Sequence, residues 1–258
     1  MKTIWFVLPA YNEGKNLRVL IGSIHNIEVI NNFKYRIVVI DDGSVDDTLD
    51  IAKELAISFP IDIIIHPRNM NLGRTIADGL TYVNEHDKPG DIIITMDADN
   101  SHPPNLSIEM ISKITSGTDL VIASRYKKGG AEIGLRFYRR VFSMAINKIL
   151  QIIFPLYNIK DYTCGYRAYS SQLIKKAFNY YCDKLVTEKG FTCMAEILIK
   201  LRPFIKTASE VPLVLRYDLK QGQSKMKVIR TIISYLFMIK REMFTNKYMS
   251  LMKISPYN

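Results

Sequence analysis

The chain has 258 residues and a formal net charge of +10, with 48% hydrophobic and 23% charged residues. This length and composition fit one large folded domain, or one domain with a modest appendage, and exclude a disordered chain. The charge is uneven, because residues 1–110 contain 9 Lys+Arg against 16 Asp+Glu and the positive excess lies in the rest of the chain.

The first half of the chain predicts alternating strands and helices. The expected strands are residues 4–10, 35–41, 61–66, 90–97 and 118–124. The expected helices are residues 15–27, 44–59, 71–86 and 103–116. Nearly continuous apolar strands separated by helices are typical of an α/β fold with a mostly parallel sheet covered on both faces. The first apolar run is brief and turns polar at once, so we expect a strand there and no signal peptide.

The second half predicts two long amphipathic helices. Residues 131–157 have apolar side chains at intervals of three and four, and Pro155 is expected to end that helix. Residues 226–244 are apolar in the middle and basic at both ends, and the apolar part is shorter than the roughly 20 residues that span a bilayer. Each segment packs as an ordinary core helix or lies in a membrane interface. We therefore expect one domain over 1–225, followed by a helix and tail over 226–258.

The basic second half predicts an anionic partner, unless the charges are distributed by chance. A membrane surface, a phosphate group or a nucleic acid would each fit. No nucleic-acid-binding motif accompanies the charge, so we expect no nucleic-acid partner. The three cysteines, Cys164, Cys182 and Cys193, have no CxxC spacing, which favours a reducing compartment and argues against both a disulfide framework and a structural zinc site.

The stretch MDADNSHPP, residues 96–104, ends an apolar run on two closely spaced carboxylates. Alternation in an extended segment would place Asp97 and Asp99 on the same side. Two such carboxylates repel each other unless a cation lies between them, and Mg²⁺ or Mn²⁺ would suit their oxygen atoms. The triplet is a weak signal by itself, since it is common in turns. We expect His102 to support this turn and not to bind a metal.

Polar segments follow three of the predicted strands, namely residues 9–13, 41–44 and 97–99. Ligands of open α/β sheets bind beyond the carboxyl ends of the strands, where these segments would meet. Asp41 and Asp42 are suited to accept hydrogen bonds from a base or a ribose, or else only to cap the next helix. The chain has no Walker motif and no GxGxxG segment after the first strand, so we do not expect a glycine cradle for phosphate.

Six segments occur in an order that resembles a known family. They are LPAYNE, VVIDDGSVDDT, NLGRTIADGL, MDADNSHPP, ASRYKKGG and DYTCGYRAYS. Together they resemble the inverting family 2 glycosyltransferases of GT-A fold over about residues 3–225. Within that family, the polyprenol-phosphate sugar transferases, which include the dolichol-phosphate mannose synthases, are the most similar. The resemblance implies a GT-A-type, Rossmann-like sheet flanked by helices.

The resemblance also implies roles for individual residues. The residues that match the nucleotide-contacting positions are Pro9, Tyr11, Glu13, Ile40 and Asp42. Asp97, Ala98 and Asp99 match the DxD segment, which places Asp99 on the metal, and Ser101 is a further metal candidate. Arg125 matches a donor-binding arginine, and with Asp97 and Asp99 it forms the implied catalytic set.

Lys225 matches a lysine near the donor diphosphate, but one neighbouring position departs from the family pattern. Leu219 stands where the family commonly has an arginine. Either Arg216 or Lys220 substitutes for that arginine, or the donor differs.

The implied function is metal-dependent transfer of a hexose, mannose from GDP-mannose, onto a polyprenol or dolichol phosphate at the cytoplasmic face of a membrane. The chain would attach peripherally or through a membrane partner subunit. A lipid phosphate is already an anion and needs no strong general base, and Arg167 would contact it unless that arginine forms a structural salt bridge. A sugar hydroxyl in cell-envelope polysaccharide or O-antigen synthesis would need a carboxylate base, for which Glu188 and Glu196 are candidates. A third alternative is a nucleotide-sugar-binding protein without catalysis.

Overall fold

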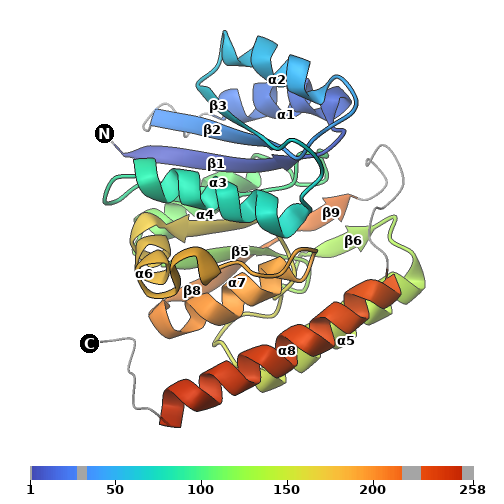
Figure 1. Ribbon diagram of the computed structural model, residues 1–258, viewed down its shortest axis with the longest axis vertical. Coiled ribbons are helices and arrows are strands. Elements are labelled where there is room, and N and C mark those ends of the chain that lie inside the picture. Colours follow the sequence, from blue (N-terminus) through green and yellow to red (C-terminus); the bar gives the residue numbers. More distant parts are fainter. Residues whose placement is uncertain (1, 28–33, 217–227, 252–258) are drawn as a thin grey trace.

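The computed structural model describes residues 2–27, 34–216 and 228–251. The strands of its main sheet are β1 (Thr3–Ala10), β2 (Lys34–Asp41), β3 (Ile61–Ile65), β4 (Ile92–Thr95), β5 (Leu120–Ser124), β7 (Arg167–Ser170) and β8 (Ala208–Pro212). These seven strands lie in the order β3-β2-β1-β4-β7-β5-β8 (Figure 1). A separate two-stranded sheet pairs β6 (Ala131–Ile133) with β9 (Val214–Arg216).

The main sheet is parallel except at β7, which runs antiparallel to both β4 and β5. This arrangement confirms the predicted α/β fold with a mostly parallel sheet. All five strands predicted in the first half of the chain are present. Strand β7 was not predicted, because its sequence RAYS has no apolar run and begins with an arginine.

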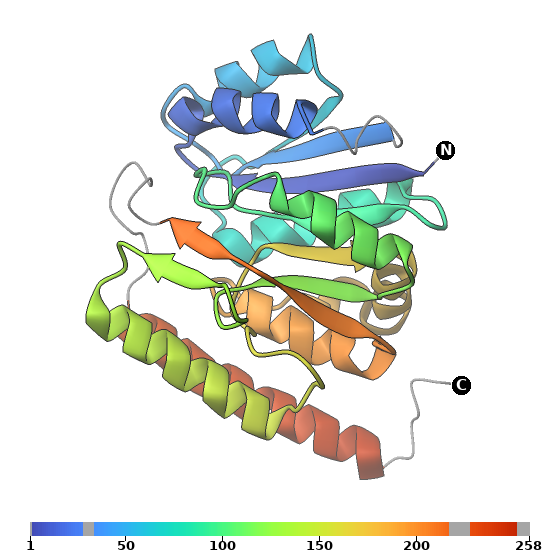
Figure 2. The same ribbon diagram turned by 180° about the vertical axis from the view of Figure 1, so that it is seen from behind.

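Helices cover both faces of the sheet. Their bounds are α1 (Gly14–His25), α2 (Thr48–Ala56), α3 (Leu72–His86), α4 (Leu106–Thr115), α6 (Ser171–Tyr181) and α7 (Cys193–Leu201). Helices α3, α6 and α7 lie on the face seen in Figure 1, and α1, α2 and α4 lie on the opposite face, seen in Figure 2. The buried strands between them form the core, so the carboxyl ends of the strands are held in a fixed arrangement.

Two longer helices, α5 (Phe137–Ile153) and α8 (Val228–Leu251), run side by side across one edge of the molecule (Figures 1 and 2). The helix predicted over 131–157 therefore begins later than expected. Residues 131–133 form β6 by pairing with β9, and Gly134 follows with a φ of 80°, which an α-helix does not permit. The helix ends at Ile153, two residues before Pro155, as the proline predicts.

Candidate functional site

The three polar segments at the strand ends meet at one edge of the sheet, as the topology predicts. Asn12, which adopts a φ of 55° after β1, donates its N–H to Oγ of Ser44 at 2.9 Å, and its Oδ1 accepts the N–H of Val45 at 2.9 Å. The turn after β4 joins this group through Asn100, whose Nδ2 lies 3.2 Å from the carbonyl oxygen of Asn16. Hydrogen bonds therefore hold the first two loops together and hold the third against the first turn of α1.

The two aspartates lie in a turn and not in the strand, because β4 ends at Thr95. Asp99 is buried, and its Oδ1 accepts the N–H and the hydroxyl of Ser101 at 3.1 and 2.5 Å. The side chain of Asp97 is 46% exposed. His102 accepts the Asp97 N–H at Nδ1, so this nitrogen has no lone pair left for a metal.

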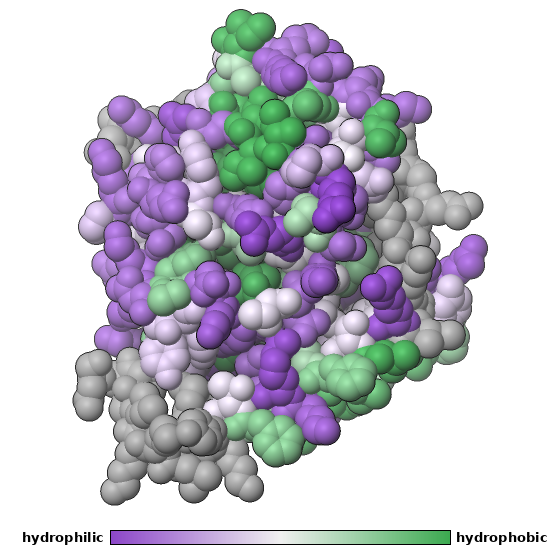
Figure 3. Space-filling model, in the orientation of Figure 1, coloured by the Kyte–Doolittle hydropathy of each residue, from purple (hydrophilic) through white to green (hydrophobic). Residues whose placement is uncertain are grey.

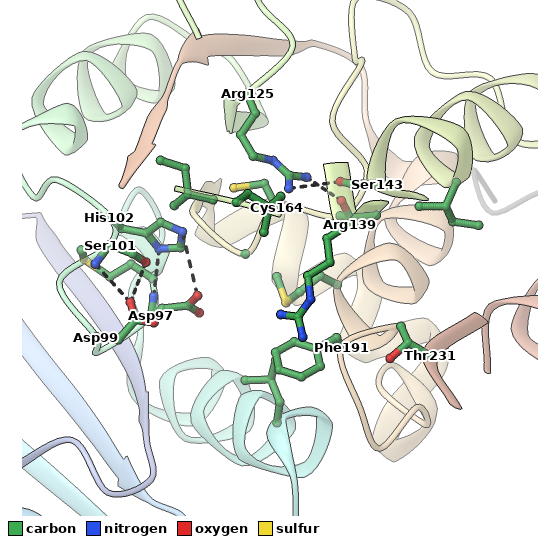
Figure 4. A pocket seen from close by; sticks show the side chains of 18 of the residues that line it. Asp97, Asp99, Ser101, His102, Arg125, Arg139, Ser143, Cys164, Phe191 and Thr231 are labelled. Carbon is green, nitrogen blue, oxygen red and sulfur yellow. Dashed lines mark hydrogen bonds and ion pairs between the residues drawn. The ribbon is translucent and has the colours of Figure 1, made fainter. Parts of the chain in front are cut away.

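A pocket of about 190 Å³ opens beside these aspartates (Figure 4). Its polar lining includes Asp97, Asp99, Ser101, Arg125, Arg139 and Thr163. Its apolar lining includes Leu135, Phe142, Ile146, Phe191, Met194 and Tyr235. The polar side chains at the strand ends and the apolar side chains from α5, α7 and α8 thus share one cavity, which suits a ligand with a charged end and an apolar end.

The carboxylates of Asp97 and Asp99 fit a hard divalent cation. Mg²⁺ typically takes one or two protein carboxylates and completes its coordination with substrate phosphate oxygens and water. Among the residues that the structure describes, no group of three or more His, Cys, Asp or Glu side chains is placed to hold an ion. Two carboxylates facing one pocket therefore suit an ion that takes its remaining ligands from phosphate oxygens and water.

Arg125 lines the pocket, and other side chains of the protein already engage its guanidinium. Nε and Nη2 each donate to Asp161 at 2.7 Å, Nη1 donates to Glu132 at 2.8 Å, and Nη2 also donates to Thr163 at 2.6 Å. Burial lowers the pKa of Arg125, but the adjacent Asp161 outweighs burial and raises the pKa above its ordinary value. The arginine predicted to bind the donor is thus also the centre of a buried ion-pair network with Asp161 and with Glu132 of β6, and it is hydrogen-bonded to Ser143 of α5.

The structure does not support the acceptor-binding role predicted for Arg167. This side chain is fully buried and does not line the pocket. Its Nε, Nη1 and Nη2 donate to the carbonyl oxygens of Cys164, Met194 and Tyr162 at 2.7 to 2.8 Å. Arg167 therefore holds the 162–165 segment against α7, and an acceptor phosphate cannot reach it without displacing these bonds.

The residues predicted to contact the nucleotide lie on or after β1 and β2, outside the pocket lining. Pro9, Tyr11 and Glu13 are half-buried at the end of β1. Ile40 is fully buried and packs towards Gly79 of α3.

Asp42 is buried, and its carboxylate holds the loop between β3 and α3 in place by hydrogen bonds. Its carboxylate accepts the N–H groups of Met70 and Asn71 at 2.7 and 3.0 Å and binds Nδ1 of His66 at 2.7 Å. Ala98 is buried between the two aspartates. Lys225, Leu219 and Lys220 lie outside the described residues, and Arg216 ends β9.

The two glutamates considered as general bases are both engaged in structural contacts and do not line the pocket. Glu196 is fully buried, and its Oε1 binds Nζ of Lys200 and Nη2 of Arg241, each at 2.7 Å. Glu188 accepts hydrogen bonds from Thr192 at 2.8 Å and from Arg241 at 2.9 Å. Neither carboxylate is placed to remove a proton from an acceptor in the pocket.

Sequence reasoning did not identify Arg139 and Phe191 as site residues, yet both line the pocket (Figure 4). The signal for Arg139 is its position on α5, three and seven residues before Phe142 and Ile146, which also line the pocket. Spacing of three and seven puts these side chains on one helix face. Phe191 lies in a loop without periodicity, so the sequence alone does not point to it.

Comparisons with known proteins agree with this architecture. Residues 5–178 match the family model of Glycosyl transferase family 2. A dolichol-phosphate mannosyltransferase of Pyrococcus furiosus is 32% identical over 238 residues, which cover 92% of this chain and 62% of that protein. A polyprenol monophosphomannose synthase of Mycolicibacterium smegmatis is 32% identical over 174 residues, which cover 66% of this chain and 62% of that protein. The chain thus spans about three fifths of the length of these curated relatives.

Solved structures show the same fold. The glucosyl-3-phosphoglycerate synthase of Mycobacterium tuberculosis, crystallised with Mn²⁺, uridine diphosphate and phosphoglyceric acid, superposes with a TM-score of 0.66. The match covers 94% of this chain and 78% of that chain at 19% sequence identity. At this identity the likeness shows a common fold.

Proposed function

Because the chain belongs to glycosyl transferase family 2, we propose that it transfers a hexose, mannose from GDP-mannose, onto the phosphate of a polyprenol or dolichol phosphate. The names of the two curated relatives support a polyprenol-phosphate acceptor and a mannosyl group. The observation that carries the proposal is the pocket, which joins a carboxylate pair at the strand ends to apolar side chains of α5 and α8.

The carboxylates of Asp97 and Asp99 would hold Mg²⁺ or Mn²⁺ against the donor diphosphate. A bound divalent cation supplies positive charge that stabilises the leaving nucleoside diphosphate. Asp99 is oriented by Ser101, and the backbone of Asp97 is oriented by His102, so the Asp99 carboxylate and the Asp97 backbone are held in place before the donor arrives. The acceptor oxygen then attacks from the opposite face of the sugar, which inverts the anomeric centre.

The charge of the pocket favours a phosphate acceptor over a sugar hydroxyl. Asp97 and Asp99 are the carboxylates among the described residues that line it, and both face the proposed cation. A hydroxyl acceptor needs a further carboxylate as general base, whereas a phosphate acceptor is already an anion. Arg139, which enters the pocket from α5, is the cation that we assign to the acceptor phosphate in place of Arg167.

The outer faces of α5 and α8 support peripheral attachment to a membrane. Apolar side chains gather along the edge formed by these helices in Figure 3. The most exposed are Phe137, Ile152, Leu236, Phe237 and Phe244, each at least 64% exposed. Exposed basic side chains, Arg136, Arg140, Arg230 and Lys240, accompany them. A basic face with large apolar side chains suits the interface of an anionic bilayer, here the cytoplasmic leaflet.

Among the described helices, none combines the length and hydropathy that a bilayer span requires. Attachment through α5 and α8 would leave both helices parallel to the membrane plane. The pocket reaches these helices, so a lipid acceptor would enter it from the membrane surface.

The test is a transfer assay on the full chain with a panel of nucleotide sugars and short-chain polyprenol phosphates, with Mg²⁺, with Mn²⁺ and with a chelator. We expect metal-dependent transfer of mannose from GDP-mannose to the lipid phosphate. Transfer to a glycan hydroxyl and to no lipid phosphate would replace this proposal with the polysaccharide alternative. Metal-dependent donor binding without any transfer would favour the non-catalytic alternative.

A matched pair of variants tests the acceptor site. Arg139→Gln removes the cation that lines the pocket, and Arg140→Gln removes an exposed cation one residue further along α5. We expect Arg139→Gln to raise the KM for the lipid phosphate about tenfold or more, because a charge-assisted hydrogen bond contributes roughly 1.5–3 kcal/mol. With soluble short-chain lipid phosphates and no vesicles, Arg140→Gln should leave that KM near the wild-type value. Equal effects of the two changes would remove Arg139 from the acceptor site.

A further inference from the structure

Helix α8 is joined to the body of the protein by a cluster of charged side chains around the buried Glu196. Glu196 of α7, which is fully buried, accepts the N–H groups of Thr187 and Glu188 at 2.9 and 2.8 Å on one oxygen. The other oxygen binds Lys200 and Arg241, each at 2.7 Å. Lys200 lies one turn along the same helix, so Glu196 keeps a compensating charge whether or not α8 is in place.

Arg241 of α8 uses its three nitrogen atoms on three carboxylates. Nη1 donates to Glu188 at 2.9 Å, Nη2 to Glu196 at 2.7 Å and Nε to Glu242 at 3.0 Å. Glu188 belongs to the loop that precedes α7, Glu196 to α7, and Glu242 to α8 itself. A planar guanidinium can bind three partners at fixed angles, whereas a lysine supplies a single point charge. Arg241 is therefore the contact through which α8 holds the loop.

The loop also rests directly on the first turn of α3. The N–H of Gly73 donates to the carbonyl oxygen of Lys189 at 2.9 Å. The carbonyl oxygen of Glu188 lies 1.7 Å from the position that a Cβ atom on residue 73 would occupy. Phe191 follows in this loop and lines the pocket together with Leu72 of α3. A shift of Glu188 would therefore move the wall of the pocket.

We propose that Arg241 is a positioning residue that couples the attachment of α8 to the shape of the pocket. With α8 docked, Arg241 holds Glu188 against Glu196 and Glu242 and keeps Phe191 on the pocket wall. Without this cation Glu188 loses its bond to α8, and the 187–191 loop separates from the helix. A membrane that fixes the outer face of α8 would in this way order the acceptor end of the pocket. The identity of the acceptor rests on the proposed function, but the mechanical link does not.

The test compares Arg241→Gln with Lys240→Gln, which removes an equal charge from the neighbouring, exposed position of α8. Hydrogen–deuterium exchange of the 186–193 segment is measured on the full chain, alone and with vesicles of phosphatidylcholine and phosphatidylglycerol in equal parts. The vesicles are used at a concentration that saturates binding of each protein, because Lys240 and Arg241 both carry charge near the proposed membrane face. We expect vesicles to slow exchange of this segment in wild type and in Lys240→Gln, and to have no such effect in Arg241→Gln. In the absence of vesicles, exchange should be about fivefold faster in Arg241→Gln than in the other two proteins.

Kinetics give a second readout. Arg241→Gln should raise the KM for the lipid phosphate about fivefold and leave the KM for the nucleotide sugar unchanged, with Arg241→Lys intermediate. Equal exchange rates in Arg241→Gln and Lys240→Gln, with and without vesicles, would overturn the coupling. Altered exchange in a protein that transfers no sugar would instead support the coupling and reject the proposed function.

Discussion

His102 accepts the backbone N–H of Asp97 at its Nδ1 atom, at 3.0 Å, while its Nε2 atom lies 3.9 Å from Oδ2 of the same aspartate. The ring is stacked on Tyr166, with a centroid separation of 5.1 Å. The imidazole therefore fixes the backbone of Asp97, and its Nε2 atom faces the carboxylate of the same residue. The placement of the aspartates therefore depends on His102 as well as on β4, which ends before them.

The hydrogen bond to Nδ1 predicts different effects of two substitutions at His102. Asn can place its side-chain oxygen near the position of Nδ1 and accept the Asp97 N–H, whereas Leu cannot. We expect His102→Leu to cost about 1–2 kcal/mol in the free energy of unfolding and to lower transfer at least tenfold. His102→Asn should lose less of both. Urea unfolding and transfer rates check this, and equal losses in the two variants would show that stacking on Tyr166 is the dominant contribution.

Asp99→Asn should abolish transfer without unfolding the protein. The asparagine oxygen can still accept the hydrogen bonds from Ser101, so the turn is preserved. The lost negative charge removes a ligand of the proposed cation, and the rate should fall by a factor on the order of a hundred or more. Thermal unfolding should stay near the wild-type midpoint. A folded variant that keeps its metal-dependent activity would remove Asp99 from the metal site.

Arg125→Met should destabilise the fold as well as the site. It leaves Asp161, which is fully buried, without its partner, and an uncompensated buried charge costs roughly 3–5 kcal/mol. Changing Asp161 to Asn in the same protein should restore part of this loss, because the unpaired charge is then gone. If Arg125→Met unfolds at the same urea concentration as the wild-type protein, the ion pair does not stabilise the fold.

The same pair has a predictable pH dependence. Burial raises the pKa of Asp161, but Arg125 outweighs burial and holds this pKa below its usual value. A depressed pKa stabilises the fold above the unfolded value of about 4 and loses that contribution as the pH falls through the folded pKa. In Arg125→Met only backbone hydrogen bonds remain to oppose the effect of burial on this pKa. The gap between wild type and variant should therefore be largest near neutral pH and narrow below about pH 4, as urea unfolding across this range would show.

The sequence predicted the parts of the fold that depend on local pattern. The apolar β-branched runs that became β1, β2 and β4 carry their own signal, and the parallel order then brings their carboxyl ends together. Strands β6, β7 and β9 carry little signal, since they are three or four residues long and depend on partners far along the chain. The helix expected from residue 131 begins later for this reason, because residues 131–133 pair as a strand with residues 214–216.

The site residues likewise divide into those that a local motif identifies and those that only the packing of the fold distinguishes. Asp97 and Asp99 were identified because two carboxylates at a strand end are visible as a motif. The environment of an arginine is not visible in this manner, so Arg167 and Arg139 could not be told apart from their neighbours. Arg167 is buried under three carbonyl oxygens and Arg139 faces the pocket, and only the packing of α5 and α7 makes that difference.

Two glycine substitutions should have opposite effects. A Cβ at residue 73 would overlap the carbonyl oxygen of Glu188, so Gly73→Ala must displace the 187–191 loop or the start of α3. We expect a loss of about 1–3 kcal/mol in the free energy of unfolding and faster proteolysis of that loop. Gly22→Ala lies in α1 with no atom near the added carbon, and it should stabilise the protein by about 0.5–1 kcal/mol. Destabilisation by both changes would show that helix geometry, not the contact with Glu188, is limiting.

Charge reversal on α5 should weaken attachment to anionic membranes. Arg136, Arg139 and Arg140 lie at the start of this helix, beside the exposed ring of Phe137. Each basic side chain near an anionic surface contributes about 1 kcal/mol, so changing all three to Glu should lower partitioning into phosphatidylglycerol vesicles at least about a hundredfold. Vesicle sedimentation at low salt measures this, and added salt should reduce the difference, because screening weakens the attraction.

A matched control separates this local effect from net charge. Lys15, Lys53 and Arg68 are exposed, and α1 and α2, which carry the two lysines, lie far from α5 and α8 in Figure 1. Reversing these three charges changes the net charge equally but leaves the basic side chains of α5 and α8 unchanged, so vesicle binding should fall much less. If both triple variants bind alike, attraction is a property of the whole charge and α5 packs as an ordinary core helix. If only the α5 variant loses binding, the start of α5 belongs to the surface that meets the membrane.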